Sequence, residues 1–157
     1  MAKSSPYITV YGMSILNKEL EQLWVRRRQV VQALSAAAAE GDRSENAEYI
    51  YRKKELRGLD RRIRYLQKRM PDLQVVSHSP ENESKIYFAA WVTLETEQGD
   101  EVEYRIVGPD EIDHQKGNIS VDSPMGKALL AKQVDDEIKI TVQGNSKTFF
   151  IVTIRYQ

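Results

Sequence analysis

The sequence contains no cysteine and only two histidines, His78 and His114. The absence of cysteine excludes disulfide bonds, thiolate metal sites and cysteine nucleophiles. The two histidines lie far apart in the chain, which argues against a histidine-based metal site or acid–base pair. We therefore expect a protein of the reducing cytoplasm.

Long hydrophobic runs and a net charge are also missing. No apolar stretch approaches the length of a membrane span, and the N-terminus lacks the basic-then-apolar layout of a signal peptide, so we expect no membrane partner. The formal net charge is zero, but residues 1–70 carry 15 Lys+Arg against 8 Asp+Glu, a balance of +7. Residues 71–157 carry 8 against 15, a balance of −7. This asymmetry predicts two modules with different partners.

Apolar residues recur at alternating steps of three and four in two stretches, which predicts two amphipathic helices. The first runs from about residue 10 to residue 40 with Thr9 as its N-cap, and the second ends at Pro71. A turn of a few residues joins them, so they run antiparallel as an arm roughly 45 Å long. Arg27 and Arg52 occupy positions where the pattern calls for apolar residues, so we expect weaker packing there. The apolar positions are Met13, Leu16, Leu20, Leu23, Val30, Leu34, Leu56, Leu59, Ile63, Leu66 and Met70.

The turn between the two helices is acidic and reads Gly41-Asp42-Arg43-Ser44-Glu45-Asn46-Ala47-Glu48. On a helical turn, Asp42 and Glu45 face the same way because they are three residues apart. Two convergent carboxylates suit Mg²⁺, which usually takes one or two protein carboxylates and completes its shell with water and phosphate. The turn offers no third ligand, so it can complete a metal site only together with another protein. The alternative is a capping box, with Asp42 as N-cap and Glu45 reaching back.

Beyond Pro71 the pattern becomes extended. Hairpin turns are expected at residues 98–100 and 143–145, and Ser123 and Pro124 open a short helix through Leu130. We therefore predict an α+β protein with an antiparallel coiled-coil hairpin in residues 1–74 and a small antiparallel sheet with one helix in residues 75–157. The predicted strands are residues 85–96, 101–107, 118–122, 137–142 and 148–156.

Motifs along nearly the whole chain resemble the bacterial GreA/GreB transcript-cleavage factors, and the basic second helix is most similar to the GreB branch. In the N-terminal part the motifs are the acidic turn through Tyr49, Tyr51, Lys53-Lys54, Leu56-Arg57, Asp60-Arg61-Arg62 and Arg64-Tyr65-Leu66. In the C-terminal part they are Tyr104-Arg105-Ile106-Val107-Gly108, Asp110-Glu111, Ile119-Ser120-Val121-Asp122-Ser123-Pro124-Met125 and Ala128-Leu129-Leu130.

This resemblance implies a mechanism in which the protein is not itself a nuclease. The globular domain docks on RNA polymerase, and the coiled coil enters the polymerase secondary channel. Tip carboxylates matching Asp42 and Glu45 help hold the second Mg²⁺ of the polymerase active site and position water. The polymerase then cuts the 3′ end of the backtracked transcript. We expect a monomer that binds no cofactor alone and shares Mg²⁺ with the polymerase.

The resemblance also implies two binding surfaces. The basic face of the second helix contacts the nascent RNA 3′ end, whereas without the resemblance it reads as a solvated face; the candidates are Arg52, Lys53, Arg57, Arg61 and Arg64. The polymerase docks on Asp122, Ser123, Pro124 and Met125. Gly126-Lys127 stands where Ala-Arg is common in the family, which bears on the strength of docking.

Three other functions remain open. Relatives and other secondary-channel proteins such as DksA modulate or inhibit transcription without cleavage, although the intact Asp42/Glu45 pair favours cleavage. The predicted C-terminal sheet and helix resemble the FKBP architecture, which would allow prolyl isomerase activity, but fold analogy alone is weak evidence. A general nucleic-acid-binding hairpin is the third possibility, and the negative charge of the C-terminal half argues against it.

Overall fold

The structure is a computed structural model that describes residues 4–40 and 46–156. The chain divides into two compact units, which we call the helical unit (Met13–Leu73) and the sheet unit (Met1–Gly12 with Gln74–Gln157). The N-terminal residues up to Gly12, which were expected in the arm, thus group with the C-terminal half. Within the described ranges, no helix is both long and apolar enough to cross a bilayer.

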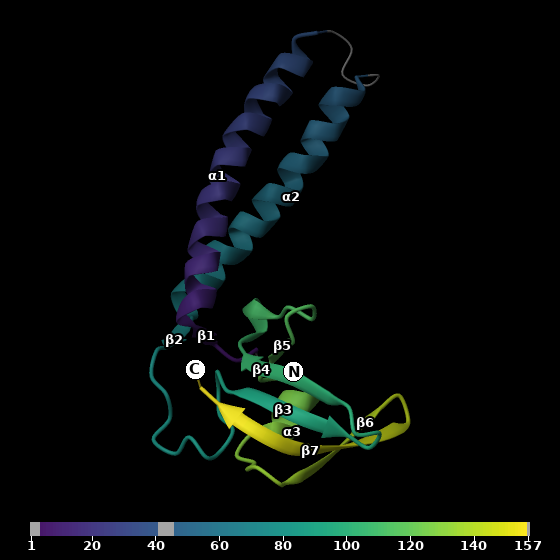
Figure 1. Cartoon of the computed structure of the whole chain (residues 1–157). Coiled ribbons are helices and arrows are strands. Elements are labelled where there is room, and N and C mark those ends of the chain that lie inside the picture. Colours follow the sequence, from purple (N-terminus) through teal and green to yellow (C-terminus); the bar gives the residue numbers. More distant parts are fainter. Residues whose placement is uncertain (1–3, 41–45, 157) are drawn as a thin grey trace. The chain divides into compact units, whose positions relative to one another are not determined.

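Two antiparallel helices, α1 (Val10–Ala38) and α2 (Ala47–Arg69), form the arm (Figure 1). The 29 residues of α1 span about 43 Å at 1.5 Å per residue. As predicted, proline ends the second helix: Pro71 lies in η1, a 3₁₀ turn over Met70–Asp72 that follows α2 directly. The buried apolar residues of the described arm are Leu16, Val30, Ala37, Ile63 and Leu66.

Ion pairs cross between the helices where the apolar pattern is interrupted. Arg27 Nε contacts Asp60 Oδ1 at 2.6 Å instead of filling an apolar position. Two further pairs join α1 and α2, Glu19 with Arg62 at 2.6 Å and Arg26 with Glu55 at 2.8 Å. Where weaker packing between the helices was expected, charged pairs therefore connect α1 and α2.

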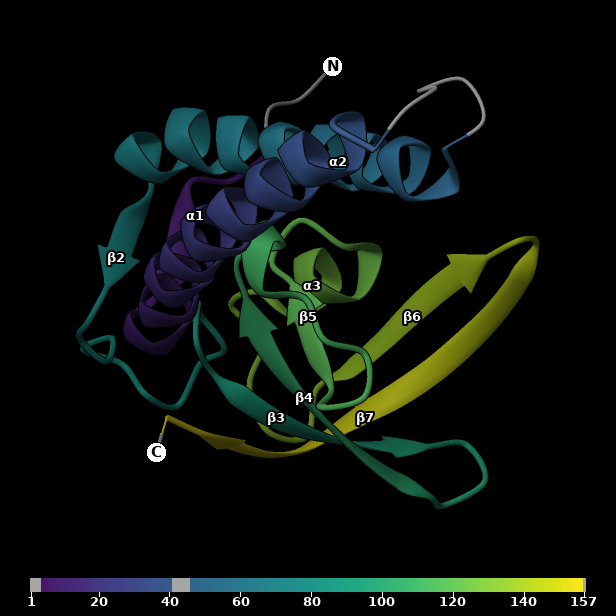
Figure 2. The same cartoon turned by 90° about the horizontal axis from the view of Figure 1, so that it is seen from above.

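The sheet unit contains a curled five-stranded sheet with the order β5-β4-β3-β7-β6 (Figure 2). Helix α3 (Pro124–Leu129) contributes Leu129 to the core, which is formed with Ile106, Leu94 and Ile151 of the inner face of the sheet. The strands are β3 (Trp91–Thr96), β4 (Glu101–Val107), β5 (Asn118–Ser120), β6 (Glu137–Val142) and β7 (Asn145–Arg155). The predicted α+β class, hairpin turns and short helix are confirmed.

Three details of the predicted sheet are wrong. The first long strand begins at Trp91 rather than at residue 85, because Ala89 has φ of 74° and its backbone cannot continue a strand. Strand β5 pairs with β4 in parallel, so the sheet is mixed rather than antiparallel. A second, two-stranded parallel sheet, formed by β1 (Tyr7–Thr9) and β2 (Gln74–Val76), was not anticipated.

Candidate functional site

The acidic tip can be described only on the α2 side. Asp42 and Glu45, the predicted magnesium-binding carboxylates, lie outside the described residues. Helix α2 begins directly after Asn46, whose Oδ1 accepts a hydrogen bond from the Tyr49 backbone N–H at 3.0 Å. The N-cap of α2 is therefore Asn46, and the capping box expected for Asp42 does not start this helix.

Asn46 also closes the end of the hairpin. Its side-chain nitrogen donates a hydrogen bond to the Ala37 carbonyl oxygen, in the last turn of α1, at 2.7 Å. One amide thus pairs with an N–H of the first turn of α2, a group that has no partner within its own helix, and gives a second hydrogen bond to the Ala37 carbonyl, which also accepts from the Glu40 N–H at 3.2 Å. Asn46 fixes the separation of the two helix ends that the acidic turn connects.

Four of the five predicted RNA-binding cations lie on one face of α2. Successive helical residues are about 100° apart, so Lys53, Arg57, Arg61, Arg64 and also Lys68 fall within about 80° of arc over about 22 Å. All five are exposed. They form no ion pair within the described ranges, although Lys53 Nζ lies 5.7 Å from the Tyr49 ring centroid. We call these five residues the basic stripe.

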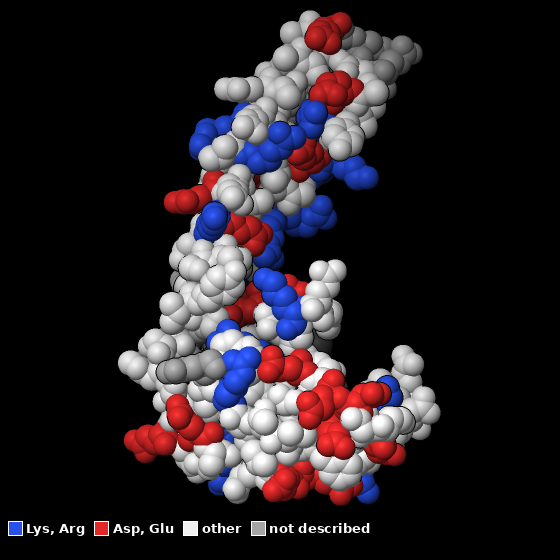
Figure 3. All heavy atoms as spheres, viewed as in Figure 1, with Lys and Arg blue, Asp and Glu red and all other residues white. Residues whose placement is uncertain are grey.

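The fifth candidate, Arg52, is used within the helical unit. Its guanidinium contacts Glu48 at 2.8 Å and Glu55 at 2.7 Å, and its side chain is 24% exposed. The remaining carboxylate of α2, Asp60, pairs with Arg27. Each carboxylate of α2 is therefore engaged by an arginine outside the basic stripe, and the stripe keeps its positive charge. Figure 3 shows Lys and Arg gathered along the helical unit and many Asp and Glu side chains on the sheet unit.

Two carboxylates that pair across the helices, Glu19 and Glu55, have pKa values below the ordinary value. A hydrogen bond from Arg62 lowers the pKa of Glu19, against a smaller opposing effect of burial. A hydrogen bond from Arg26 lowers the pKa of Glu55 in the same way, with help from Arg52. Both carboxylates are therefore ionised at neutral pH and cannot act as proton donors there. Their role is to join the helices.

The predicted docking residues Asp122, Ser123, Pro124 and Met125, which we call the docking turn, are contiguous at the start of α3. Ser123 is the N-cap, because its Oγ accepts from the Gly126 N–H at 3.0 Å, and Pro124 follows it in the first turn, exposed. Met125 packs partly against the core. Asp122 is held by Ser5: Oδ2 accepts from the Ser5 N–H at 2.8 Å, and Oδ1 accepts from the Ser5 hydroxyl. Side-chain hydrogen bonds therefore hold Asp122 and Ser123, and Pro124 is the exposed member of the turn.

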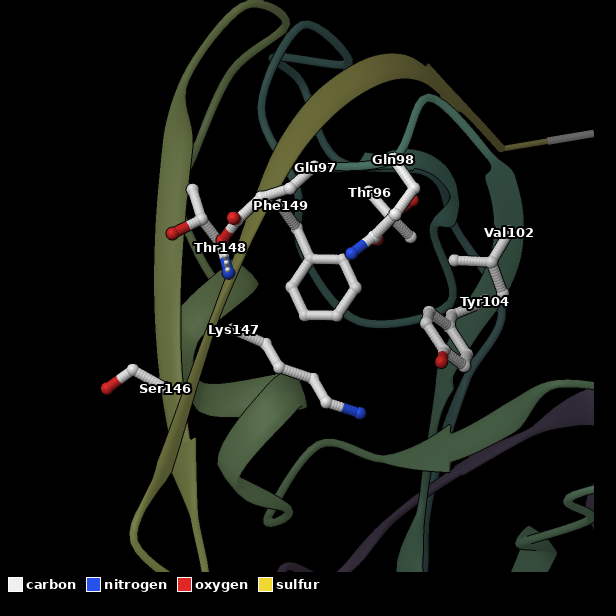
Figure 4. Close-up of a pocket in the computed structure, with 9 residues that line it drawn as sticks. All are labelled: Thr96, Glu97, Gln98, Val102, Tyr104, Ser146, Lys147, Thr148 and Phe149. Atoms are coloured by element: carbon white, nitrogen blue, oxygen red, sulfur yellow. Dashed lines mark hydrogen bonds between the residues drawn. The ribbon is translucent and has the colours of Figure 1, made fainter.

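An open hollow of about 460 Å³ lies on the sheet unit, between the β3–β4 hairpin and β7 (Figure 4). Val102, Tyr104 and Phe149 give it an apolar part, while Glu97 and Lys147 are polar members of its lining. A hollow with such a mixed lining gives no particular support to prolyl isomerase activity.

Among residues 4–40 and 46–156, no group of three or more His, Cys, Asp or Glu is placed to hold a metal ion.

Comparison with known proteins assigns the chain to a family. The N-terminal model of the GreA/GreB elongation factors matches residues 6–75, and the C-terminal model matches residues 81–156. The chain belongs to the GreA/GreB family of transcription elongation factors. Its GreB-like character agrees with relatives named transcription elongation factor GreB. That of Pseudomonas aeruginosa is 52% identical over 153 residues, covering 97% of this chain and 91% of the relative. That of Pasteurella multocida is 52% identical over 158 residues, covering 100% and 99%.

Solved structures of the family are more distant. Thermus aquaticus Gfh1 is 25% identical and aligns with a TM-score of 0.45, covering 97% of this chain and 99% of that one. The elongation factor GreA/GreB from Nitrosomonas europaea is 21% identical, with a TM-score of 0.44 and coverage of 97% and 100%.

Two residues that organise the site were not identified from the sequence. Asn46 was read as part of the acidic turn, although an Asn before a helical pattern is itself an N-cap signal. Glu111 was noted only within a motif, yet its carboxylate binds the Thr9 N–H and hydroxyl at the start of α1. A contact between residues 102 positions apart has no local signal in one sequence.

Proposed function

We propose that this elongation factor stimulates transcript cleavage by bacterial RNA polymerase. In this proposal the sheet unit binds the polymerase, and the helical hairpin enters the secondary channel. The polymerase then cleaves the 3′ end of the backtracked nascent RNA, and arrested complexes resume elongation. Membership of the GreA/GreB family and full-length similarity to GreB proteins support this function.

The observation that carries the proposal is the cap of α2. Because Asn46 supplies the cap, Asp42 and Glu45 are not required to begin this helix. Two carboxylates on the segment that joins two antiparallel helices are suited to give oxygen ligands to Mg²⁺ at the end of a narrow arm. In the polymerase centre, the ion would activate water for attack on the phosphodiester. The polymerase supplies the other ligands, so this chain needs no metal site of its own.

The basic stripe suits the RNA that backtracking extrudes. Five exposed cations on one helix face attract phosphates without reading sequence. That property fits a factor that must act on any arrested transcript. Arg52 is less suited to this role than the sequence indicated, because Glu48 and Glu55 already bind its guanidinium.

The docking turn is the proposed polymerase contact on the sheet unit. Its backbone is fixed by the Ser123 cap and by the Ser5–Asp122 hydrogen bonds, so binding costs little ordering entropy. Pro124 is exposed at the helix start and offers a rigid apolar contact.

A cleavage assay on purified backtracked complexes tests the proposal. Wild-type protein should accelerate Mg²⁺-dependent release of 3′ RNA fragments. Asp42→Asn and Glu45→Gln should slow it by roughly 10- to 100-fold, the range seen when groups supporting a metal site are removed. Glu40→Gln, an exposed glutamate at the other end of the turn, is the matched control and should act like wild type. Polymerase binding without accelerated cleavage by wild type would instead indicate a modulator of transcription.

A further inference from the structure

Two exposed tyrosines lie on one line along α2, with a glycine midway between them. Tyr51, Gly58 and Tyr65 follow one another at steps of seven residues, and residues at that spacing lie only about 20° apart around a helix. Tyr51 is 63% exposed and Tyr65 is 44% exposed. The two tyrosines therefore lie on the same side of α2, separated by about 21 Å along its axis.

Each tyrosine ring rests against an arginine of the same helix. Arg52 Cζ lies 5.2 Å from the centroid of the Tyr51 ring, and Arg62 Cζ lies 5.3 Å from that of Tyr65, both within the range of cation–π contacts. Ion pairs orient both arginines: Arg62 with Glu19 across the hairpin at 2.6 Å, and Arg52 with two carboxylates of α2. Arg52 thus supports a ring, a role that requires no contact with phosphate.

Gly58 has no packing role that requires a glycine. A Cβ built at this position has no described atom within 4 Å. In a helix interior glycine is less favourable than alanine, so the residue weakens α2 without relieving a close contact in the described helical unit. Glycine also lets a ligand approach the backbone closely. Gly58 therefore leaves a gap between the two tyrosines at which a ligand can lie against the helix.

The basic stripe runs beside this line on the same helix. Its centre lies about 100° farther around α2, about 10 Å across the surface of a helix 10–12 Å thick. Arg61, the nearest member of the stripe, is only about 40° from Tyr65. Nucleotides whose phosphates lie on the stripe can therefore turn their bases toward the tyrosines. A positive track with aromatic side chains beside it is how proteins bind single-stranded nucleic acid without sequence preference.

We infer that Tyr51, Gly58 and Tyr65 form a stacking face for the bases of single-stranded RNA. Each tyrosine ring stacks on a base, and Gly58 lets the RNA lie close to the helix between the two rings. The phosphates of the same RNA lie along the basic stripe. This inference rests on the proposed function, which brings extruded RNA to the helical hairpin, and it adds contact with bases to contact with phosphates.

RNA binding by the free, full-length protein tests the stacking face. The probes are a fluorescein-labelled single-stranded RNA of about 10 nucleotides and an abasic RNA of the same length and charge, followed by anisotropy at low salt. Wild type should bind the intact RNA more tightly, because only that RNA has bases to stack. The Tyr51→Ala/Tyr65→Ala double variant should bind intact RNA about tenfold or more weakly and abasic RNA like wild type.

Three comparisons separate stacking from other effects. Tyr51→Phe/Tyr65→Phe keeps both rings and should bind like wild type. Val25→Ala, which truncates an exposed apolar residue of α1, is the matched control and should change neither affinity. Removing charge from the basic stripe should weaken binding of both RNAs and lower the salt dependence, whereas the tyrosine-to-alanine variant should keep the wild-type salt dependence.

Gly58→Leu tests the gap between the tyrosines. Leucine is a good helix former and its Cβ meets open space, so thermal melting followed by helical circular dichroism should show a midpoint at or above that of wild type. The added side chain should nevertheless lower the affinity for intact RNA by about threefold or more, because it keeps the RNA away from the helix. A purely structural role of Gly58 predicts no such loss.

Four results would overturn the inference. They are equal binding of the two RNAs by wild type, an unchanged affinity of the tyrosine-to-alanine variant for intact RNA, an equal loss on both RNAs, and wild-type RNA affinity in Gly58→Leu. Loss of polymerase affinity with unchanged RNA binding would mean that the tyrosines contact protein instead. If wild-type protein does not stimulate cleavage, the proposed function fails, while binding of the two RNAs to the free protein still reports whether the face stacks bases.

Discussion

The side-chain amide of Asn46 bridges the two helices of the arm by donating to the Ala37 carbonyl at 2.7 Å. The same side chain caps α2 through the Tyr49 N–H. Because both bonds come from one short side chain, the ends of α1 and α2 are held at a fixed separation. The two points at which the acidic turn begins and ends are therefore a defined distance apart.

Substitutions of Asn46 should separate these two bonds. Asn46→Asp keeps the acceptor for the Tyr49 N–H but loses the donor to Ala37, and Asn46→Ala loses both. We expect Asn46→Ala to destabilise the hairpin by about 1 kcal/mol, the usual cost of a lost N-cap, and Asn46→Asp to cost less. Urea unfolding followed by helical circular dichroism measures this. Equal stability of Asn46→Ala and wild type would contradict the assigned cap.

The basic stripe should control RNA affinity through charge alone. Replacing Arg57, Arg61 and Arg64 together by alanine removes three phosphate contacts, which should reduce the slope of log affinity against log salt by about 2 for single-stranded RNA. Crosslinking of the RNA 3′ end to the factor in backtracked complexes should fall in parallel.

Arg26→Ala is the control for that experiment, because Arg26 pairs with Glu55 on the other helix. It should weaken the hairpin slightly and leave the salt dependence of RNA binding unchanged. An unchanged slope in the triple variant, or an equal loss in the control, would count against the stripe.

The hairpin should lose part of its stability as the pH falls below about 4.3. Hydrogen bonds from Arg62 and Arg26 hold the pKa values of Glu19 and Glu55 below the ordinary value. Since the folded pKa is the lower one, this stabilisation is fully present above the unfolded pKa of about 4.3 and is lost as pH falls through the depressed folded values. The effect is small because the pairs are partly exposed. In thermal melts, the acid-induced loss should be smaller in the Glu19→Gln/Glu55→Gln double variant; an identical loss would contradict the assignment.

Asp122 should act on docking chiefly through Ser5. Both of its carboxylate oxygens accept hydrogen bonds from that residue. Asp122→Asn can keep both bonds by accepting from the Ser5 N–H and donating to the Ser5 hydroxyl, whereas Asp122→Ala loses both. We therefore expect polymerase affinity, measured by fluorescence anisotropy, to fall clearly in Asp122→Ala and little in Asp122→Asn. Equal losses in the two variants would mean that the charge itself contacts the polymerase.

Much of the fold follows from local patterns. The helices follow from apolar spacing, the hairpin turn at residues 143–144 from Gly144, and the start of α3 from Ser123 and Pro124. These signals act over a few residues, so one sequence contains them. In the structure, Gln143 and Gly144 both adopt positive φ, as a two-residue hairpin requires.

The missed features depend on contacts between distant residues. Strands β1 and β2 have three residues each, too few for a periodic signal, and they pair across more than sixty positions. The positive φ of Ala89 has no sequence signal, because alanine is not a residue that favours that conformation. The arm's ion pairs also have no local signal, because Arg27 interrupts the apolar pattern and its partner Asp60 lies 33 positions away on the other helix.

The Mg²⁺ dependence of cleavage tests the central claim most directly. If Asp42 and Glu45 contribute ligands to the polymerase ion, Asp42→Asn should shift the Mg²⁺ concentration for half-maximal stimulated cleavage upward by about tenfold, and high Mg²⁺ should restore part of the rate. A variant that cleaves slowly with the Mg²⁺ dependence of wild type, or one that cleaves at the wild-type rate throughout, would contradict the account.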